Sequence, residues 1–297
     1  MSKAGLVALV GRPNAGKSTL INALVGTKVA IVSDKPQTTR NRIVGVRNLP
    51  EGQVVYVDTP GIHRPLHRMN VRMVDVAVQS MNHADLVCVV ADAGLPVGGG
   101  DEYLAGLVGK VAVPVMIALN KVDLVEKTAL LPQMQRWGRL ATFAEIIPVS
   151  ALTGDNIETL VRAFLQHLPE GEPLYPADFV TDQPEQVYVA EIVREKLLQH
   201  TRDELPFTSA VLVDHFEEAD ERGIIRVYCT IVVERESQKP IIIGRAGSMI
   251  KQIGTEARLE LESFFATKVF LDLRVKTRPD WREDTRVLDQ LGVIDER

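Results

Sequence analysis

Near its start the chain reads Gly11-Arg12-Pro13-Asn14-Ala15-Gly16-Lys17-Ser18. This stretch, called here the phosphate loop, fits G-x-x-x-x-G-K-[ST], the pattern of a loop that cradles phosphates. An apolar run of strand length, residues 6–10, precedes it, and the helical pattern of residues 19–25 follows and ends at Gly26. An ordinary glycine-rich turn is the alternative, but a strand, a loop and a helix in this order are the context that the motif requires. The stretch therefore predicts a nucleotide-binding α/β domain.

Each residue type in this loop has a chemical reason to be there. The two glycines let the backbone approach phosphates, while successive N–H groups and the helix N-terminus supply positive potential. We expect Lys17 to reach the β- and γ-phosphates and the Ser18 hydroxyl to bind Mg²⁺. Asn14 is a candidate ligand for K⁺ bridging the phosphates, with a solvated loop asparagine as the alternative. The nucleotide-binding residues predicted here are Gly11, Arg12, Pro13, Asn14, Ala15, Gly16, Lys17, Ser18 and Thr19.

The bulk composition is that of an ordinary globular protein. A length of 297 residues allows one large or two medium domains, and 45% hydrophobic with 25% charged residues is typical of such chains. The net charge of −5 argues against a protein that binds nucleic acid over its whole surface, but it allows a local basic patch. Cys88 and Cys229 lie in apolar runs, which favours buried thiols in a reducing cytosol. Without a membrane-span pattern or a signal-peptide pattern, we expect a cytoplasmic protein.

Apolar runs alternate with helical patterns through the first half of the chain. The strand-like runs are residues 42–47, 53–57, 86–91, 114–119 and 146–149. The last three lack a period of two, as strands buried on both faces do. Alternating strands and helices predict a mostly parallel sheet covered on both faces. We assign residues 1–172 to this α/β P-loop domain.

Two further segments lie where predicted strands end, the position at which open α/β sheets bind ligands. In Asp58-Thr59-Pro60-Gly61, the Asp58 carboxylate is expected to hold Mg²⁺ through water and the Gly61 N–H to contact the γ-phosphate. Either segment alone could be an ordinary turn. The candidate site residues of the first are Asp58, Thr59, Pro60 and Gly61.

The second segment, Asn120-Lys121-Val122-Asp123, has the chemistry to read guanine. Guanine shows two N–H donors on one edge, and the two oxygens of Asp123 can accept both, whereas adenine offers no matching pair. Lys121 can pack its stem on the base, and Asn120 can tie this segment to the phosphate loop. In Ser150-Ala151-Leu152, the Ala151 N–H could donate to guanine O6. We therefore expect GTP and GDP as ligands, with Asn120, Lys121, Asp123, Ser150, Ala151 and Leu152 around the base.

The pattern changes after a linker, residues 173–185, that is rich in proline and acid. Residues 186–278 follow the order α-β-β-α-α-β, which predicts a separate small α+β domain. Between its last two helices lies Gly244-Arg245-Ala246-Gly247, called here the 244–247 loop. It matches the G-x-x-G loop that clamps about four nucleotides of single-stranded nucleic acid in KH domains. The tail, residues 279–297, is charged and amphipathic and receives no assignment.

Basic charge is concentrated around the 244–247 loop. Residues 235–278 hold nine basic and five acidic side chains in an otherwise acidic domain. Arg245 can contact phosphate, and residues 241–243, all isoleucine, could form an apolar floor for bases. A solvated helix face is the alternative. The predicted RNA-binding residues are Ile243, Gly244, Arg245, Ala246, Gly247 and Lys251.

The four motifs of the first domain, in this order, resemble the translation-factor-related GTPases. From about residue 6 to residue 276 the chain resembles the bacterial Era GTPase family, also in residues 191–196, residues 204–206 and Gln37-Thr38-Thr39-Arg40. The resemblance implies a GTPase domain, a type II KH domain, Mg²⁺-dependent GTP hydrolysis, binding of 16S rRNA and assistance to assembly of the small (30S) ribosomal subunit. It also implies that Thr39, in preference to Thr38, is the switch threonine that closes on Mg²⁺. The catalytic residues would then be Lys17, Thr39 and Gly61, and the metal ligands Ser18, Thr39 and Asp58.

One position departs from the usual GTPase pattern. Where many GTPases carry a glutamine that orients water, this chain has Ile62, which cannot hydrogen-bond to water. We expect slow intrinsic hydrolysis, with water positioned by backbone groups or by a partner.

Two other functions compete with RNA binding. The second domain could dock on a protein or a membrane surface, but residues 187–202 mix acids with bases, whereas a membrane-bound helix has a basic polar face. A signalling GTPase with an unrelated appendage would leave the basic cluster unexplained. We expect a cytoplasmic monomer and keep peripheral association with the inner face of the cell membrane as an alternative.

Overall fold

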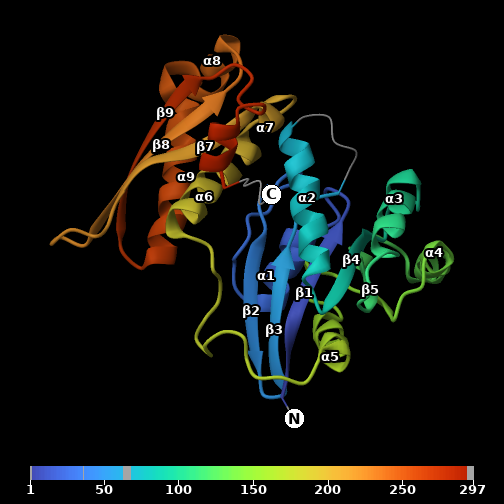
Figure 1. Cartoon of the computed structure of the whole chain (residues 1–297). Helices are drawn as coiled ribbons and strands as arrows, with labels where there is room; N and C mark the ends of the chain where they lie inside the picture. Colours follow the sequence, from blue (N-terminus) through green and yellow to red (C-terminus); the bar gives the residue numbers. More distant parts are fainter. Residues whose placement is uncertain (1, 36, 63–67, 293–297) are drawn as a thin grey trace. The chain divides into compact units, whose positions relative to one another are not determined.

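The structure, a computed structural model, describes residues 2–35, 37–62 and 68–292. The chain divides into two compact units, the first formed mainly by residues up to Asp182 and the second mainly by residues from Gln183 onward. The units are described separately below, and both are drawn in Figure 1.

The first unit is built on a six-stranded sheet with the strand order β2-β3-β1-β4-β5-β6. Only the β2–β3 hairpin is antiparallel, so the predicted mostly parallel sheet is confirmed. The carboxyl ends of β1, β3, β4 and β5 therefore meet at one edge of the sheet. The strands are β1 (Lys3–Gly11), β2 (Ile43–Leu49), β3 (Gly52–Asp58), β4 (Leu86–Asp92), β5 (Val115–Asn120) and β6 (Ile146–Pro148).

Helices cover both faces of this sheet. One buried cluster joins α1 (Lys17–Val25) and α5 (Ile157–His167) to alternate strand residues such as Leu9 and Cys88. The opposite cluster joins the strands to α2 (Arg68–Asn82), α3 (Gly99–Val108) and α4 (Lys127–Leu140), and α2 crosses the near face of the sheet in Figure 1. Successive strand residues point to opposite faces, which explains why the buried strands show no polar alternation.

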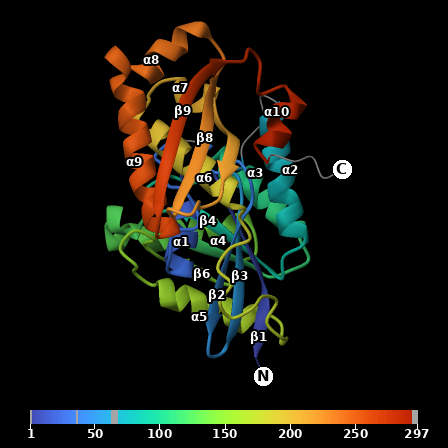
Figure 2. The ribbon, with the colours of Figure 1, turned by 90° about the vertical axis from the view of Figure 1, so that its left-hand side faces the viewer.

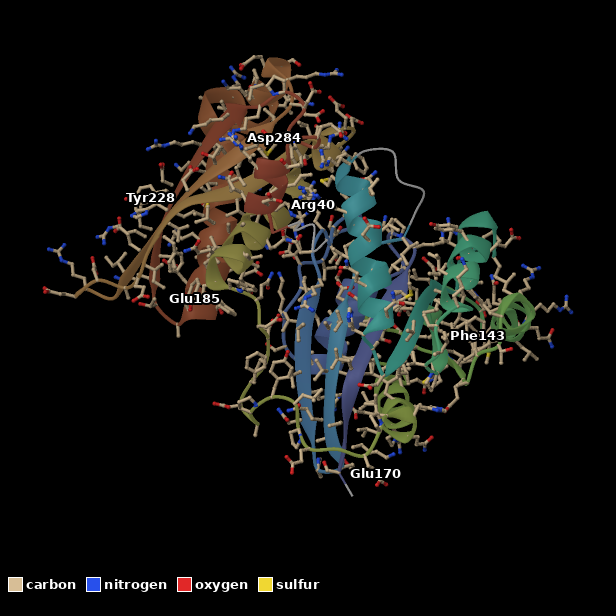
Figure 3. The ribbon with its side chains drawn as sticks, in the orientation of Figure 1. Arg40, Phe143, Glu170, Glu185, Tyr228 and Asp284 are labelled. Atoms are coloured by element: carbon tan, nitrogen blue, oxygen red, sulfur yellow. The ribbon has the colours of Figure 1, made fainter. Side chains whose placement is uncertain are left out.

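Aromatic packing holds α4 against this second face. Trp137, in the last turns of α4, is 3% exposed, and its ring meets that of Phe143 edge-on with 6.2 Å between centroids. Figure 3 marks Phe143 just beyond the helix.

The first part of the predicted linker is packed rather than free. The Gln53 side chain accepts the N–H groups of Leu174 and Tyr175 and donates to the Tyr175 carbonyl at 2.8 Å. Farther along, the Val46 N–H donates to the Val180 carbonyl at 2.8 Å. These bonds hold residues 174–180 to the β2–β3 hairpin of the first unit.

The second unit contains a three-stranded sheet, β7-β8-β9, in which β7 and β8 are antiparallel and β8 and β9 are parallel. Figure 2 shows α9 running along this sheet, with α8 near its end. The predicted order α-β-β-α-α-β is present, with short helices added in the connections and the tail. The elements are α6 (Glu185–His200), α7 (Leu205–Thr208), β7 (Ser209–Glu217), β8 (Ile224–Val233), α8 (Lys239–Ile243), α9 (Ser248–Phe265), β9 (Lys268–Thr277) and α10 (Thr285–Gln290).

The tail, which the sequence pattern left unassigned, is largely structured. Trp281 is fully buried, and its Nε1–H donates to the Thr208 carbonyl at 2.9 Å. Arg282 donates two hydrogen bonds to the Glu234 carboxylate, at 2.6 and 2.9 Å. These contacts bind the start of the tail to the second unit, whereas residues 293–297 of the predicted tail lie outside the described residues.

Among the helices within the described residues, none has the length and apolar character needed to cross a membrane.

Candidate functional site

The phosphate loop connects the end of β1 to the start of α1. Gly16 has a φ of +91°, and a Cβ there would stand 2.3 Å from Asn120 Nδ2, so glycine alone fits both the backbone and the space. A cavity of about 230 Å³ opens beside the loop. The predicted residues that line it are Pro13, Asn14, Gly16, Lys17, Ser18, Thr19, Thr39, Gly61 and Lys121.

The three predicted metal ligands meet in this site. Ser18 Oγ lies 2.7 Å from Thr39 Oγ1 and 2.9 Å from Asp58 Oδ2, and Thr39 Oγ1 lies 3.1 Å from the same carboxylate oxygen. The other oxygen, Asp58 Oδ1, is buried and has no hydrogen-bond partner among the described residues. Hydroxyl and carboxylate oxygens are the ligands that Mg²⁺ prefers, so this donor set fits the ion. Thr38 is directed elsewhere, because its hydroxyl donates to the Lys35 carbonyl at 2.7 Å.

Lys17 and Asp58 form a buried pair of opposite charges. Burial lowers the pKa of Lys17, and the negative charge of Asp58 opposes that shift. Burial likewise raises the pKa of Asp58, against the charge of Lys17 and the hydrogen bonds from Ser18 and Thr39. Lys17 Nζ donates to the carbonyls of Gly11 and Arg12, at 3.4 and 3.2 Å. Phosphate oxygens and a divalent cation would supply the counter-charges that both buried groups need.

The segment predicted to read the base is joined to the phosphate loop as expected. Asn120 Nδ2 donates to the Ala15 carbonyl at 3.0 Å. Asn120 Oδ1, however, accepts the Ala151 N–H at 2.9 Å. A guanine O6 would share the Ala151 N–H with Asn120, and the contact to the base stays a prediction. Leu152 is 78% exposed.

Sequence reasoning missed how two side chains of this segment are held. Ser150 Oγ donates to Asp123 Oδ1 at 2.5 Å and so orients the carboxylate. Lys121 Nζ lies 2.7 Å from Asp92 Oδ2. A usable signal for Asp92 existed, because it ends the buried strand β4 just as Asp58 and Asn120 end theirs.

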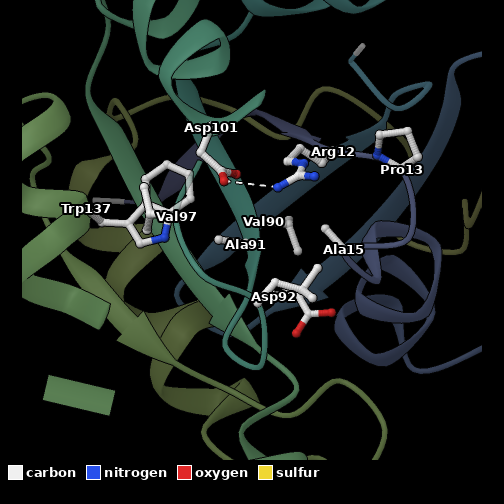
Figure 4. Close-up of a pocket in the computed structure, with 10 residues that line it drawn as sticks. Arg12, Pro13, Ala15, Val90, Ala91, Asp92, Val97, Asp101 and Trp137 are labelled. Carbon is white, nitrogen blue, oxygen red and sulfur yellow. Dashed lines mark hydrogen bonds and ion pairs between the residues drawn. The ribbon is translucent and has the colours of Figure 1, made fainter. Parts of the chain in front are cut away.

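Three residues predicted to bind nucleotide, namely Arg12, Thr59 and Pro60, do not line the phosphate cavity. Arg12 turns its guanidinium toward Asp101, with Nη1 3.1 Å from Oδ2 (Figure 4). Thr59 is fully buried and donates its hydroxyl to the Leu9 carbonyl at 2.8 Å, and the adjacent Pro60 is buried too. Thr59 holds the end of β3 to β1 through this bond, and the Arg12 side chain meets α3 instead of the cavity.

Ile62 is placed as its chemistry predicts. Its N–H donates to the Gly11 carbonyl at 3.0 Å, and its side chain is 2% exposed within the core under α2. An apolar side chain held in the core cannot orient water. Replacing it by alanine would open a core cavity, so such a variant tests stability as well as hydrolysis.

In the second unit, the 244–247 loop joins α8 to α9 by a sharp turn. Gly244 has a φ of +74°, and a Cβ there would lie 2.7 Å from Met249 Cβ. Arg245, Ala246 and Lys251 are exposed, as contact with a nucleic-acid backbone requires. The predicted apolar floor is corrected in one respect. Ile242 is fully buried, so only Ile241 and Ile243, 52% and 36% exposed, can face a ligand.

A groove of about 290 Å³ lies between α9 and β9, next to this loop. Of its residues only Lys251 was predicted. Gly254 lets the helix approach the strand closely, since a Cβ there would be 3.3 Å from a methyl group of Leu273. The sequence signal for this groove was the spacing of four between Ile250, Gly254 and Arg258, which places them on one face of α9. Its lining residues are Ile250, Lys251, Gly254, Thr255, Arg258, Leu271 and Leu273.

Comparison with known families and proteins matches both units. A family model described as 50S ribosome-binding GTPase matches residues 6–121, and one described as KH domain matches residues 205–282. The chain is 48% identical to the GTPase Era of Geotalea daltonii, with 97% of each chain covered. It is 42% identical to the GTPase Era of Staphylococcus haemolyticus, over 99% of this chain and 98% of that relative.

Two solved structures are similar over 99% of this chain and 100% of theirs, each at 40% identity. One, with a TM-score of 0.95, is a tyrosine-to-alanine variant of Aquifex aeolicus Era bound to GDP and AlF4⁻. The other, with a TM-score of 0.96, is Era in complex with MgGDPNP and nucleotides 1506–1542 of 16S ribosomal RNA. Similarity of this extent covers the phosphate loop, the base-reading segment and the KH domain together. The chain therefore belongs to the Era family of GTPases.

Proposed function

We propose that this protein is a GTP-operated switch that binds single-stranded 16S ribosomal RNA through its KH domain and assists assembly of the small ribosomal subunit. The observation that carries the GTPase half is the convergence of Ser18, Thr39 and Asp58 beside the phosphate loop, with one buried carboxylate oxygen left without a partner among the described residues.

In the phosphate site, Ser18, Thr39 and Asp58 would hold Mg²⁺. The ion would offset the negative charge of the phosphates. Lys17 would exchange its contacts with the loop carbonyls for phosphate oxygens. The position of Thr39 beside Asp58 supports its assignment as the switch threonine over Thr38.

Hydrolysis would rely on positioning and on the charges of Lys17 and the metal ion, without a polar side chain that orients water. The Gly61 N–H is our candidate contact to the γ-phosphate, and Gly61 approaches the loop so closely that a Cβ would stand 2.8 Å from the Pro13 nitrogen. Because Ile62 is buried, no polar side chain at that position orients the attacking water. Slow intrinsic turnover follows, and a partner that adds water-orienting groups would accelerate it.

The RNA half rests on the 244–247 loop and the groove beside α9. Arg245 in the loop and Lys251 in the groove offer positive charge, while Arg258 lies in the groove with Nη1 2.8 Å from Glu262. Leu271 and Leu273 offer an apolar wall for bases. A KH groove takes about four unpaired nucleotides. The relative solved with nucleotides 1506–1542 of 16S RNA supports that RNA, and hence the small subunit, as the partner.

An oligoribonucleotide with the sequence of nucleotides 1506–1542 of 16S RNA, as in the relative's complex, is expected to bind at least tenfold more tightly than a scrambled strand of equal length. Tenfold corresponds to about 1.4 kcal/mol. Fluorescence anisotropy in the presence of a GTP analogue, then of GDP, measures both the affinity and its nucleotide dependence. Pairing the strand with its complement is the control, because the groove accepts single strands. Equal affinity for the scrambled or the paired strand would contradict the proposal.

We also propose that Asn14 helps to bind K⁺ beside the phosphates. Asn14 Nδ2 donates to the Asp34 carbonyl at 2.7 Å, which leaves the amide oxygen available as a ligand. Exchanging K⁺ for Na⁺ should slow wild-type hydrolysis by about tenfold, or ~1.4 kcal/mol, and should change Asn14→Ala much less. Single-turnover assays in the two salts measure this. An unchanged K⁺ preference in Asn14→Ala would place the ion elsewhere, and Asn14→Asp, which keeps an oxygen ligand, serves as the control.

We place the protein in the cytoplasm as a monomer. Peripheral membrane association stays an alternative that α6 supports poorly. Its Lys196 lies 2.8 Å from Glu195, and Arg194 forms an ion pair with Glu191. Such paired charges do not form the basic face that binds anionic lipid.

A further inference from the structure

The Arg12 side chain joins the phosphate loop to α3 through an ion pair. Its Nη1 lies 3.1 Å from Asp101 Oδ2, in the first turn of α3 (Figure 4). The same Asp101 oxygen accepts the Gly98 N–H at 2.9 Å, so it also caps the helix. The Asp101 side chain is 9% exposed and that of Arg12 41%. One partner is thus nearly buried, which distinguishes this pair from an ordinary surface ion pair.

The absence of a side chain at Gly100 lets Arg12 approach the start of α3 closely. A Cβ on Gly100 would come within 3.0 Å of Arg12 Nε, so the arginine lies directly over the start of α3. Beneath it is a cavity of about 40 Å³, lined in part by Ala15, Asp92 and Trp137. Figure 4 shows Arg12 and Asp101 facing one another across one side of this cavity.

The backbone carbonyl of Arg12 connects its ion pair to other atoms of the phosphate loop. The Arg12 carbonyl accepts Lys17 Nζ at 3.2 Å and the Ala15 N–H at 3.3 Å. A shift of Arg12 would therefore move a carbonyl that helps to set both the catalytic lysine and the turn of the loop. Side chain and carbonyl together connect α3 to the atoms that meet the phosphates.

We infer that Arg12 is a positioning residue. Its ion pair with Asp101 holds the phosphate loop in its binding geometry before the nucleotide arrives, so that binding does not have to order the loop. Loss of the pair should weaken nucleotide affinity because part of the binding free energy is then spent on ordering. The rate of hydrolysis by the nucleotide-bound protein should change little, because the bound phosphates then hold the loop in place.

The test compares Arg12→Ala, Asp101→Asn and the double variant in the full-length protein. Asp101→Asn keeps an oxygen for the Gly98 N–H and removes only the charge. Each single variant should raise the Kd for GDP and the KM for GTP by about tenfold, equivalent to about 1.4 kcal/mol, with kcat within about threefold of wild type. The double variant should be no weaker than either single one, because both remove the same interaction.

Two further variants distinguish a positioning role of Arg12 from a general loss of folding stability. Arg12→Lys should restore most of the affinity, and Glu102→Gln, which removes an acid from the same helical turn, should bind GDP like wild type. Thermal unfolding without nucleotide completes the set. Additive losses of GDP affinity in the double variant, or unchanged affinity in the single ones, would overturn the inference. So would a loss of affinity that parallels a loss of thermal stability and also appears in Glu102→Gln.

Discussion

Asp123→Asn is expected to exchange the preference for guanine for a preference for xanthine. Xanthine carries a carbonyl acceptor where guanine carries its exocyclic amino donor. Ser150 Oγ donates to one oxygen of Asp123, and in the variant the asparagine oxygen can keep that bond. The NH₂ group is then left to face the base, where it can donate to xanthine but meets a donor on guanine.

The expected loss of GTP affinity is at least a hundredfold, or about 2.7 kcal/mol, since hydrogen bonds to a charged group contribute about 1.5–3 kcal/mol each. Competition binding with GTP, ATP and XTP measures it. Asp92→Asn is the matched control: its carboxylate pairs with Lys121, so its loss should not create a preference for XTP. Unchanged GTP preference in Asp123→Asn would mean that another group reads the base.

Replacing Arg245 and Ala246 together by aspartate should lower the affinity for single-stranded ribosomal RNA by at least tenfold, or about 1.4 kcal/mol. Both side chains are exposed, and both glycines of the loop remain. Ala246 has a φ of +51°, a left-handed conformation that aspartate adopts more readily than most residues. The fold should therefore survive, while two negative charges would meet the RNA backbone. The salt dependence should weaken as well, because fewer counterions are released on binding.

RNA affinity at two salt concentrations measures this effect. The control is Ala219→Asp with Arg222→Asp, which makes the same change of charge at exposed positions in the β7–β8 connection. GTP binding should be the same in all three proteins, because the nucleotide motifs end by residue 152. Equal RNA affinity of wild type and the loop variant would move the RNA site off the 244–247 loop. No RNA binding by either would return the protein-docking function to first place.

Local sequence was sufficient for the architecture and for placing Ser18 and Asp58 at one site beside the phosphate loop. Strand length, helical period and glycine position are properties of neighbouring residues, and they predicted the parallel sheet, the phosphate loop and the order of the second domain. The position of a residue at a strand end also sufficed to bring Asp58 and Asn120 to the phosphate loop, because parallel strands end at one edge.

What only the tertiary structure decided was the direction of individual side chains and N–H groups. Thr38 and Thr39 are adjacent and chemically identical, and Thr39 alone meets Asp58. Arg12 turns to Asp101, 89 residues away, and the Ala151 N–H turns to Asn120. Ile242 and Trp281 are buried by neighbours that no local sequence pattern predicts. In each case the outcome depends on which group a distant part of the chain brings within hydrogen-bonding or packing distance, and that information lies in the folded contacts rather than in any single stretch of sequence.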